Sequence, residues 1–399
     1  MALPFLNAAI LIAASLFLGA ALSRVSARTP LPLGALLLLS GFAISEVLVA
    51  AGLDTGFRWF HFRDLVFNVL VPILIFDTAY RLDLGKLREA GWLIGFASGP
   101  ILLASLAAMA VLLFIAFDHP TGFPLITALA AAALFAAVDP SETQALMVEH
   151  KASNQIGIAL QGESVMSDVL AVSLFTVFVY GMQSASGYLY SGVLGFTVAL
   201  LVGAALGFVF GFLGRWLVLP CKGVEARAVG ALAVAFAGYL FVEYLTSGSG
   251  IVATLICARL LRPHDLEDVE ACASILAAAG WSAKVILFVI AGTTITTFMF
   301  TEQWLAMLIA IAIVVMLRLV LALVSIGCAN LFASDKHSWR DGFTFALGGG
   351  RGAIALALAL SVPLEFEAWY TLQSMTYGVV IASLIVQPLI LRVWLARLA

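Results

Sequence analysis

The apolar stretch IALQGESVMSDVLAVSLFTVF, which runs over residues 158–178, carries Glu163, Ser164, Ser167 and Asp168 near its start. On a helix, Ser164 and Asp168 share one face and Glu163 and Ser167 share the adjacent face, because residues four apart are neighbours. Carboxylate and hydroxyl oxygens suit hard cations, and carboxylates also carry protons. The stretch therefore predicts a site that handles ions. The alternative, in which both acids only anchor helix packing through salt bridges, is incomplete because the chain has few buried cations to pair with them.

A second candidate site lies where Asp139 precedes Pro140 within LAAAALFAAVDPSETQALMVEH. Proline removes a backbone donor and clashes with the preceding turn, so it breaks a helix. Such a break inside a membrane is tolerated only where it is buried in protein or lines a cavity. It frees carbonyls and exposes half-helix ends that stabilise ions, which makes Asp139 a candidate cation ligand.

A third segment, FALGGGRGAIALALAL, places four glycines around Arg351. Glycine permits unwinding and close backbone approach. A cation between the glycines can offset the carbonyl ends and the carboxylate of the other interruption. The sequence thus predicts two broken helices that meet.

The elements that must position these residues are membrane spans. The chain has 399 residues, of which 63% are hydrophobic and only 11% charged, whereas a soluble domain has about 25% charged residues. Because an apolar run of about 20 residues crosses a bilayer, we expect an all-α polytopic membrane protein of about thirteen spans. Their approximate ranges are roughly 4–22, 31–50, 64–80, 91–117, 121–149, 155–182, 187–217, 224–245, 248–262, 270–298, 303–333, 340–361 and 368–396.

Charge placement predicts the orientation. With the N-terminus outside and the C-terminus inside, the inner loops and tail hold 15 Lys and Arg residues, whereas the outer loops hold only Arg58 and Arg63. Positive residues concentrate on the cytoplasmic side of membrane proteins. The apolar N-terminus is interpreted as the first span, and the chain is expected to carry no soluble regulatory domain.

Several further charges fall within or near the spans. Glu46, Asp77 and Glu243 lie near predicted interfaces and are interpreted as solvated. Lys284 either extends its long stem toward water or pairs with a buried carboxylate. Arg318 lies in mid-span and stays charged at any relevant pH, so it requires a partner.

The two interrupted segments are the fifth and twelfth predicted spans. They stand seven spans apart, and because seven is odd, the two interrupted spans cross the membrane in opposite directions. Opposite directions are the pattern of an inverted-topology repeat with its binding site at the crossing. The fold expected is therefore an inverted repeat with two broken, crossing helices.

At this point a family resemblance is evident. The stretches NVLVPILIFDTAYRLDLGKLREAGW, AVDPSETQALM, QGESVMSDVLAV, LRLVLALVS and GGGRGAIALALAL resemble, in order and spacing, motifs of the monovalent cation/proton antiporters. That family includes the bacterial NhaP proteins and the animal sodium/proton exchangers. The resemblance implies a homodimer and one transmembrane domain over residues 1–399. A moving core would lie around residues 91–182 and 303–396, against a dimerisation scaffold around residues 1–80 and 187–298.

The resemblance also implies roles for matching residues. Asp168 would alternately hold a proton or the cation, with Asp139 and Ser164 completing the cation site. Glu163 would pair with Arg318, and Arg351 would stabilise the crossing. Ser167 and Val138 occupy positions of the family's ion site.

This chain departs from the family pattern at three of its positions. Ser167 stands where the electroneutral branch has Asn and the electrogenic branch has Asp, and Val138 replaces a Thr. Glu142 adds a carboxylate near Asp139. Glu142, Lys284 and Asp77 are therefore accessory candidates, and the departures keep altered ion selectivity open.

The function predicted is exchange of a monovalent cation for protons by alternating access, with both ions competing for Asp168. Sodium is the expected cation, and lithium, potassium or another cation are alternatives. A cation channel and an intramembrane aspartyl protease using Asp139 and Asp168 are the rivals from other classes. The protease lacks the required sequence context around its second acid, so we expect no enzyme. We expect no cofactor, and we predict location in the bacterial plasma membrane.

Overall fold

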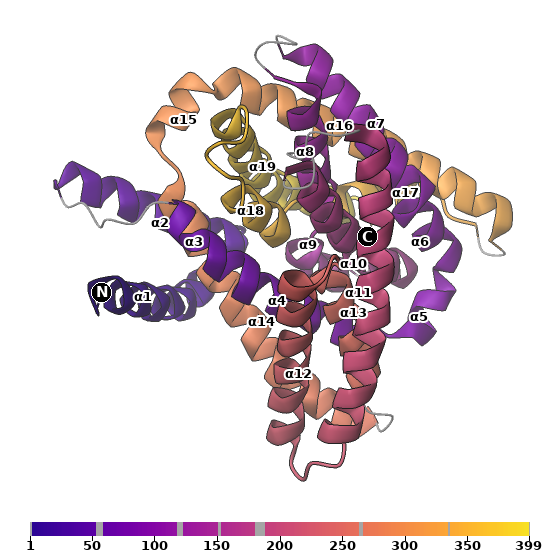
Figure 1. The fold of residues 1–399 in the computed structure, drawn as a ribbon. Helices are drawn as coiled ribbons and strands as arrows, with labels where there is room; N and C mark the ends of the chain where they lie inside the picture. The colour runs from indigo at the N-terminus through magenta and orange to yellow at the C-terminus, as the bar shows by residue number, and fades with distance from the viewer. Residues whose placement is uncertain are drawn as a thin grey trace.

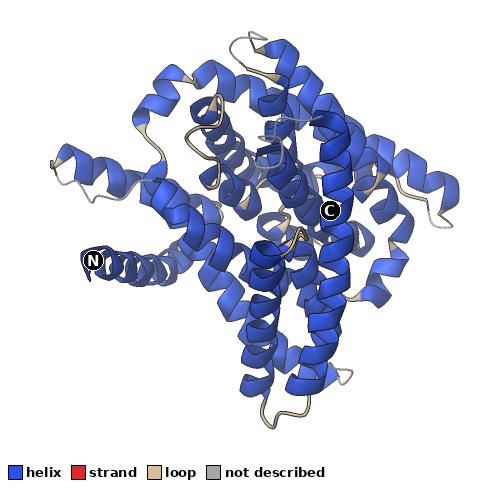
Figure 2. Cartoon of the chain, viewed as in Figure 1, coloured by secondary structure: helices blue, strands red, loops and turns tan. Residues whose placement is uncertain are grey.

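The structure, a computed structural model, describes residues 2–52, 59–117, 123–150, 153–179, 188–262, 266–333 and 336–398. Within these ranges the chain consists of helices and connections without a strand (Figure 2). The all-α prediction is confirmed. Arg58, used above for the orientation, lies outside the described residues.

The first half of the chain forms α1 to α10 and one π-helical segment, η1 (Figure 1). Their bounds are α1 Ala2–Ser26, α2 Leu33–Ala50, α3 Trp59–Leu65, η1 Val66–Leu70, α4 Val71–Arg81, α5 Leu84–Glu89, α6 Gly91–Ser98, α7 Pro100–Ala116, α8 Leu125–Ala136, α9 Ser141–Glu149 and α10 Asn154–Val179. The second half forms α11 Tyr188–Val218, α12 Val224–Leu245, α13 Gly250–Leu261, α14 Leu266–Thr294, α15 Thr297–Glu302, α16 Trp304–Phe332, α17 Trp339–Gly348, α18 Ala353–Leu360 and α19 Trp369–Ala396.

Nine of the helical segments in the described ranges are long and apolar enough to cross a membrane, judged by length and composition. They are Ala9–Ser26, Leu33–Ala50, Gly91–Ala116, Asn154–Val179, Leu194–Val218, Val224–Leu245, Val269–Thr294, Trp304–Phe332 and Trp369–Ala396. Each of the predicted spans contains a helix or an interrupted helix pair. The number of thirteen crossings stays a prediction.

Both predicted interruptions are present. The fifth predicted span is divided into α8 and α9, and the twelfth into α17 and α18. Pro140 immediately precedes α9 and cannot donate a backbone hydrogen bond. In the twelfth span, residues 349–352 separate the two half-helices.

Two further irregularities were not predicted. Gly99 separates α6 from α7, and Pro100 begins α7. In the third predicted span, η1 lies between α3 and α4, with Pro72 near the start of α4. A π-helical turn shifts the backbone hydrogen-bond ladder and often marks a functional position. Here the side-chain hydroxyl of Tyr239 donates to the free carbonyl of Phe67, 2.9 Å away.

The helices associate in two sets. In one set, α14 packs along α2 and α4, and α13 packs against α4, α11 and α12. In the other, α8 packs between α7 and α10, and α16 packs against α7, α17 and α19. The half-helix α18 contacts both sets, through α14 on one side and α19 on the other. The division into a scaffold and a core that move against each other stays a prediction.

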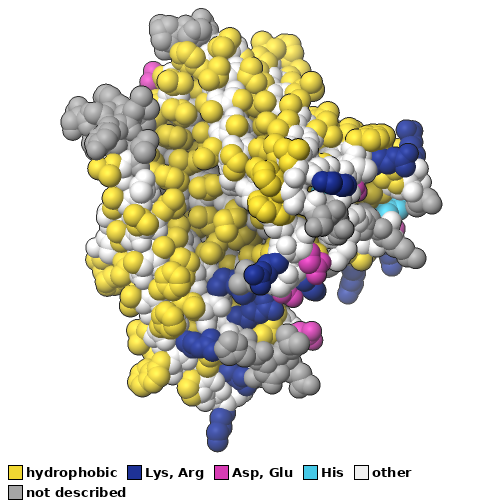
Figure 3. Space-filling model, turned by 90° about the vertical axis from the view of Figure 1, so that its right-hand side faces the viewer, with side chains coloured by type: hydrophobic (Ala, Val, Ile, Leu, Met, Phe, Trp, Pro, Cys, Tyr) yellow, Lys and Arg dark blue, Asp and Glu magenta, His cyan; other side chains and the backbone are white. Residues whose placement is uncertain are grey.

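The outer surface is apolar over most of its area. Large hydrophobic side chains such as Phe212 and Trp216 of α11 and Leu308 of α16 are exposed. In Figure 3 such side chains cover most of one face, and Lys and Arg side chains gather toward one end of it. A large contiguous apolar surface marks a membrane-facing or partner-facing region, and this apolar face fits lipid.

Candidate functional site

The two interruptions cross in the interior of the protein. Asp139 and Gly350 form an isolated antiparallel bridge, in which the Asp139 N–H donates to the Gly350 carbonyl at 2.8 Å. The Thr143 hydroxyl donates to the carbonyl of Gly348 at 2.7 Å. Arg351 Nη1 donates to the carbonyl of Ala137 at 3.1 Å. The backbone groups that each broken helix leaves free are therefore partly satisfied by the other broken helix.

The glycines of the second interruption make this close approach sterically feasible. A β-carbon at Gly352 would overlap the carboxylate of Asp139, and one at Gly349 would overlap the guanidinium of Arg318. Side chains from two other parts of the chain thus occupy the space that larger residues would fill. The glycines serve close packing here, as the sequence predicted.

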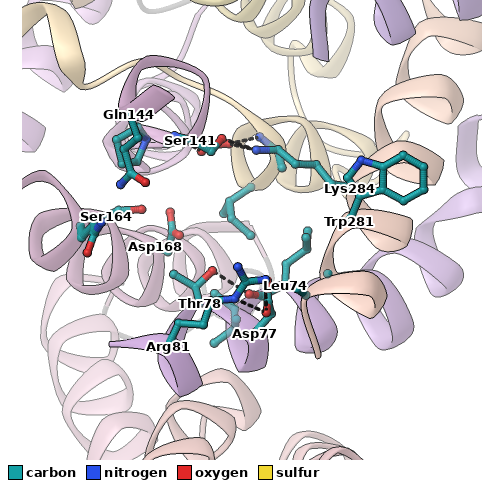
Figure 4. A pocket seen from close by; sticks show the side chains of 18 of the residues that line it. Leu74, Asp77, Thr78, Arg81, Ser141, Gln144, Ser164, Asp168, Trp281 and Lys284 are labelled. Atoms are coloured by element: carbon teal, nitrogen blue, oxygen red, sulfur yellow. Dashed lines mark hydrogen bonds and ion pairs between the residues drawn. The ribbon is translucent and has the colours of Figure 1, made fainter. Parts of the chain in front are cut away.

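A cavity of about 620 Å³ reaches the crossing from one side. At its inner end lie Asp139, Ser164, Asp168 and Lys284, with backbone of Ala353. Asp168 is 7% exposed, and its Oδ1 has no hydrogen-bond partner among the described residues. In Figure 4, Asp168 and Ser164 approach the open space from one side, and Lys284 from the other.

The mouth of the cavity lies at the end of α4. Asp77 and Arg81 line it and form a two-pronged ion pair, with Nε to Oδ1 at 2.7 Å and Nη2 to Oδ2 at 2.8 Å. The Arg81 side chain is 46% exposed. In the predicted orientation this end faces the cytoplasm. Asp77, interpreted above as a solvated interfacial acid, is instead paired and lines the cavity.

Asp139 already has a cationic partner. Its Oδ2 lies 3.2 Å from Lys284 Nζ. Lys284 also donates to the hydroxyl of Ser141. Of the two interpretations of Lys284 given by the sequence, pairing with a carboxylate is the one the structure supports.

Behind the crossing lies a second set of predicted residues. Glu163 is 2% exposed and pairs with Arg318 through both carboxylate oxygens, one at 2.8 Å. Arg318 Nη2 also donates to the carbonyl of Phe345 at 3.1 Å, which ties α10 and α16 to α17. The hydroxyl of Ser167 accepts the Val138 N–H at 3.1 Å and donates to the Ser164 carbonyl at 2.9 Å.

The predicted residues therefore separate into three places. Asp77, Asp139, Ser164, Asp168 and Lys284 line the cavity, whereas Val138, Glu163, Ser167, Arg318 and Arg351 brace the crossing. Glu142 does neither: it is not among the lining residues, and its Oε1 lies 3.0 Å from the position of a β-carbon at Gly34 of α2.

Sequence reasoning missed several polar residues of the site, among them Gln144, Gln161 and Thr143. Gln144 and Gln161 line the cavity, and Thr143 bonds across the crossing. Gln161 could have been found, because it is three residues before Ser164 and seven before Asp168, on the same helix face. The other two lie on the short helix α9, where the pattern gives no apolar background against which a polar residue stands out.

The chain is similar to known proteins over most of its length. The family model described as "Sodium/hydrogen exchanger, transmembrane" matches residues 12–397. The low-affinity Na(+)/H(+) antiporter NhaS1 of Synechocystis is 28% identical over 344 residues, which are 82% of this chain. The Na(+)/H(+) antiporter NhaG of Bacillus atrophaeus is 24% identical over 352 residues, or 84% of this chain. The chain spans 63% and 64% of the length of these two relatives.

The fold is also similar to a solved structure. The sodium proton antiporter MjNhaP1 of Methanocaldococcus jannaschii superposes with a TM-score of 0.81 at 18% identity, covering 99% of both chains. The prediction of an inverted-repeat antiporter fold is thereby confirmed.

Proposed function

The chain belongs to the sodium/hydrogen exchanger family, an assignment that its match over residues 12–397 establishes, and we propose that it exchanges a monovalent cation for protons across the membrane. The observation that carries the proposal is the position of the Asp168 side chain. Its carboxylate is buried at the inner end of a polar cavity, with one oxygen unpartnered among the described residues.

Competition for Asp168 supplies the coupling. An ionised carboxylate without a partner is costly in a low-dielectric interior. Either a proton or a dehydrated cation removes that cost, and one carboxylate does not hold both. The Ser164 hydroxyl lies beside Asp168 in the same cavity and offers a further oxygen ligand. The empty, charged site resists burial, so only the loaded forms change sides.

Alternating access is the transport step that fits this arrangement. The cavity opens beside Arg81, and on the other side of the crossing the α18 residues 355–360 are fully buried. A movement of the crossing helices against α4 and α14 would close this cavity and open the opposite side. A channel needs a continuous pore, whereas the cavity described here ends at Asp168 and residues 353–354.

Sodium is the proposed cation. The antiporters NhaS1 and NhaG carry Na(+)/H(+) in their names, and oxygen ligands suit sodium. Potassium or another monovalent cation is the alternative, since Ser167 and Glu142 depart from the family pattern. We further propose a homodimer in a bacterial plasma membrane, with the N-terminus outside and the C-terminus inside.

The variant Asp168→Asn tests the proposal. The amide keeps the shape of the carboxylate but neither exchanges a proton nor balances a cation, so we expect folding to persist and exchange to be lost. The measurement is cation-driven proton movement in liposomes carrying the purified chain, followed with a pH-sensitive dye for sodium, lithium and potassium.

Glu149→Gln also replaces a carboxylate by an amide, at an exposed residue of α9. It is the matched control and should retain exchange. Proton movement that persists in Asp168→Asn would show that another group carries the ions. Wild-type liposomes that exchange protons for none of the three cations would refute the proposed function itself.

A further inference from the structure

Lys284 enters the ion site from outside the crossing helices. It belongs to α14, which packs along α2 and α4, whereas Asp139 lies between the half-helices α8 and α9. The Lys284 side chain is 23% exposed and the Asp139 side chain 19%, both toward the cavity that they line. The ammonium therefore sits where a transported cation would otherwise meet Asp139.

Both oxygens of the Asp139 carboxylate already have polar partners. Its Oδ1 accepts from the Ser141 N–H at 3.0 Å and from the Ser141 hydroxyl at 2.5 Å. Its Oδ2 accepts from the Ala353 N–H at 3.3 Å and faces Lys284 at 3.2 Å. Both oxygens of Asp139 therefore have partners, whereas the Oδ1 of Asp168 has none among the described residues.

The ion pairs around the crossing also distinguish Asp139 from Asp168. Among the described residues, three acids, Asp139, Glu163 and Asp168, lie at the crossing. Glu163 is paired with Arg318, and Asp139 with Lys284. At the mouth, Asp77 and Arg81 cancel. Asp168 is thus the acid of the crossing without an ion pair among the described residues, and a single monovalent cation or a single proton can balance it.

We propose that Lys284 is a resident counter-ion that occupies Asp139 permanently and leaves Asp168 as the only exchangeable acid. This inference rests on the proposed function, and it changes the role of Asp139 from a ligand of the transported cation to a fixed, neutralised pair. Asp168 then takes up either one proton or one monovalent cation, each with a single positive charge, so one cation exchanges for one proton without net charge movement.

Lys284 is suited to this role during a conformational change. Its ammonium ends a flexible stem of four carbons, so it can stay with Asp139 while the backbones of α14 and the crossing shift. Its nearest aromatic ring, Phe288, lies one turn further along α14 with its centroid 5.9 Å from Nζ. The pair thereby joins the crossing to α14 without a rigid link.

The test removes Lys284 and Asp139 first singly and then together. Lys284→Met leaves Asp139 unpaired, and Asp139→Asn leaves Lys284 unpaired. We expect each single variant to lose exchange activity by about tenfold or more, as coupled charges in contact do. The double variant Asp139→Asn/Lys284→Met removes one acid and one base and so has the net charge of the wild type, and we expect its exchange rate to return to within about threefold of the wild type.

The double variant distinguishes the two roles of Asp139. If Asp139 were a ligand of the transported cation, the double variant would fold but stay as inactive as Asp139→Asn, and the inference would be overturned. The amount of protein in the membrane and its thermal unfolding in detergent, measured alongside, separate a transport defect from a folding defect.

The kinetics of the single variant Lys284→Met keep the test decisive if the double variant does not fold. In Lys284→Met the extra negative charge should lower the KM for the cation and lower kcat, because the site attracts cations but no longer crosses in neutral form. An unchanged KM would identify Lys284 as a packing residue only. Lys284→Arg, which keeps the charge, should retain exchange.

The wild type provides the electrical test. Its exchange rate should be the same with and without an imposed potassium diffusion potential, and a potential-sensitive rate would overturn the inference. Absence of any exchange in the wild type would overturn the proposed function and this inference together. Exchange in the wild type with an inactive, folded double variant would overturn the inference alone.

Discussion

At the scale of single residues, the acids near the crossing differ in what already satisfies them. Glu163 is held by Arg318 through both oxygens, away from the cavity. Asp139 is held by Lys284 and by backbone N–H groups. Asp168 lines the cavity, and its buried Oδ1 has no hydrogen-bond partner among the described residues. The chemistry of each acid is thus decided by its neighbours rather than by its type.

The Glu163–Arg318 pair yields a prediction about stability. Arg318→Ala would leave Glu163 buried and unpaired, and removing one partner of a buried pair costs about 3–5 kcal/mol. We expect much less folded protein in the membrane and a lower unfolding temperature in detergent. Arg392→Ala, at an exposed arginine of α19, should leave both unchanged. A stable and active Arg318→Ala protein would contradict the structural role of the pair.

At the scale of elements, the site depends on the crossing of α8–α9 with α17–α18. Each broken helix leaves some backbone groups at the interruption without a partner in its own segment. Each relies on the other through the Asp139–Gly350 bridge and the Thr143 and Arg351 hydrogen bonds. The crossing therefore forms as a unit, and a change in one segment disturbs the other.

The variant Gly352→Ala tests this dependence. Its β-carbon would overlap the carboxylate of Asp139, so the crossing must shift. We expect exchange to fall by about tenfold or more, since misplacement of a binding group by about 1 Å can cost 100-fold. Exchange is measured in liposomes with a pH-sensitive dye.

The matched control is Gly327→Ala on α16, where an added β-carbon meets nothing within 4 Å. Alanine has a higher helix propensity than glycine there, so stability should be equal or slightly greater. If Gly352→Ala exchanged ions as fast as Gly327→Ala, close packing at the crossing would not be needed for transport.

At the scale of the whole molecule, exposed apolar helices surround a mostly apolar core that contains a small set of polar and charged side chains. The exposed side chains of α11 and α16 are large and apolar, while the buried set includes Glu163, Asp168 and Arg351. The core resembles that of a soluble protein, but the exposed apolar side chains differ from a soluble surface, where charged residues predominate among the exposed ones. This distribution places ion chemistry inside and lipid contact outside.

The predicted orientation is tested by labelling single cysteines in a variant without the four native ones. Ala51→Cys, in the exposed turn after α2, should react with a membrane-impermeant thiol reagent on intact cells. Thr29→Cys, in the exposed turn after α1, should react only after the membrane is permeabilised. The reverse pattern would invert the orientation and place the mouth of the cavity outside.

The sequence by itself determined the class of fold and the places where helices break. Pro140 and the glycines around Arg351 act on the backbone within one turn, so their effect can be read locally. The apolar runs likewise decide membrane insertion segment by segment. The break at Gly99 was missed because glycine is frequent in membrane helices and gives little signal on its own.

Only the tertiary structure decided which charges meet. Lys284 lies more than a hundred residues from Asp139, and nothing in the periodicity of either segment selects one acid for it rather than another. Glu142, close to Asp139 in sequence, points instead toward Gly34 of α2. Pairing between distant helices depends on how their surfaces pack in three dimensions, and this packing left the Oδ1 of Asp168 unpartnered.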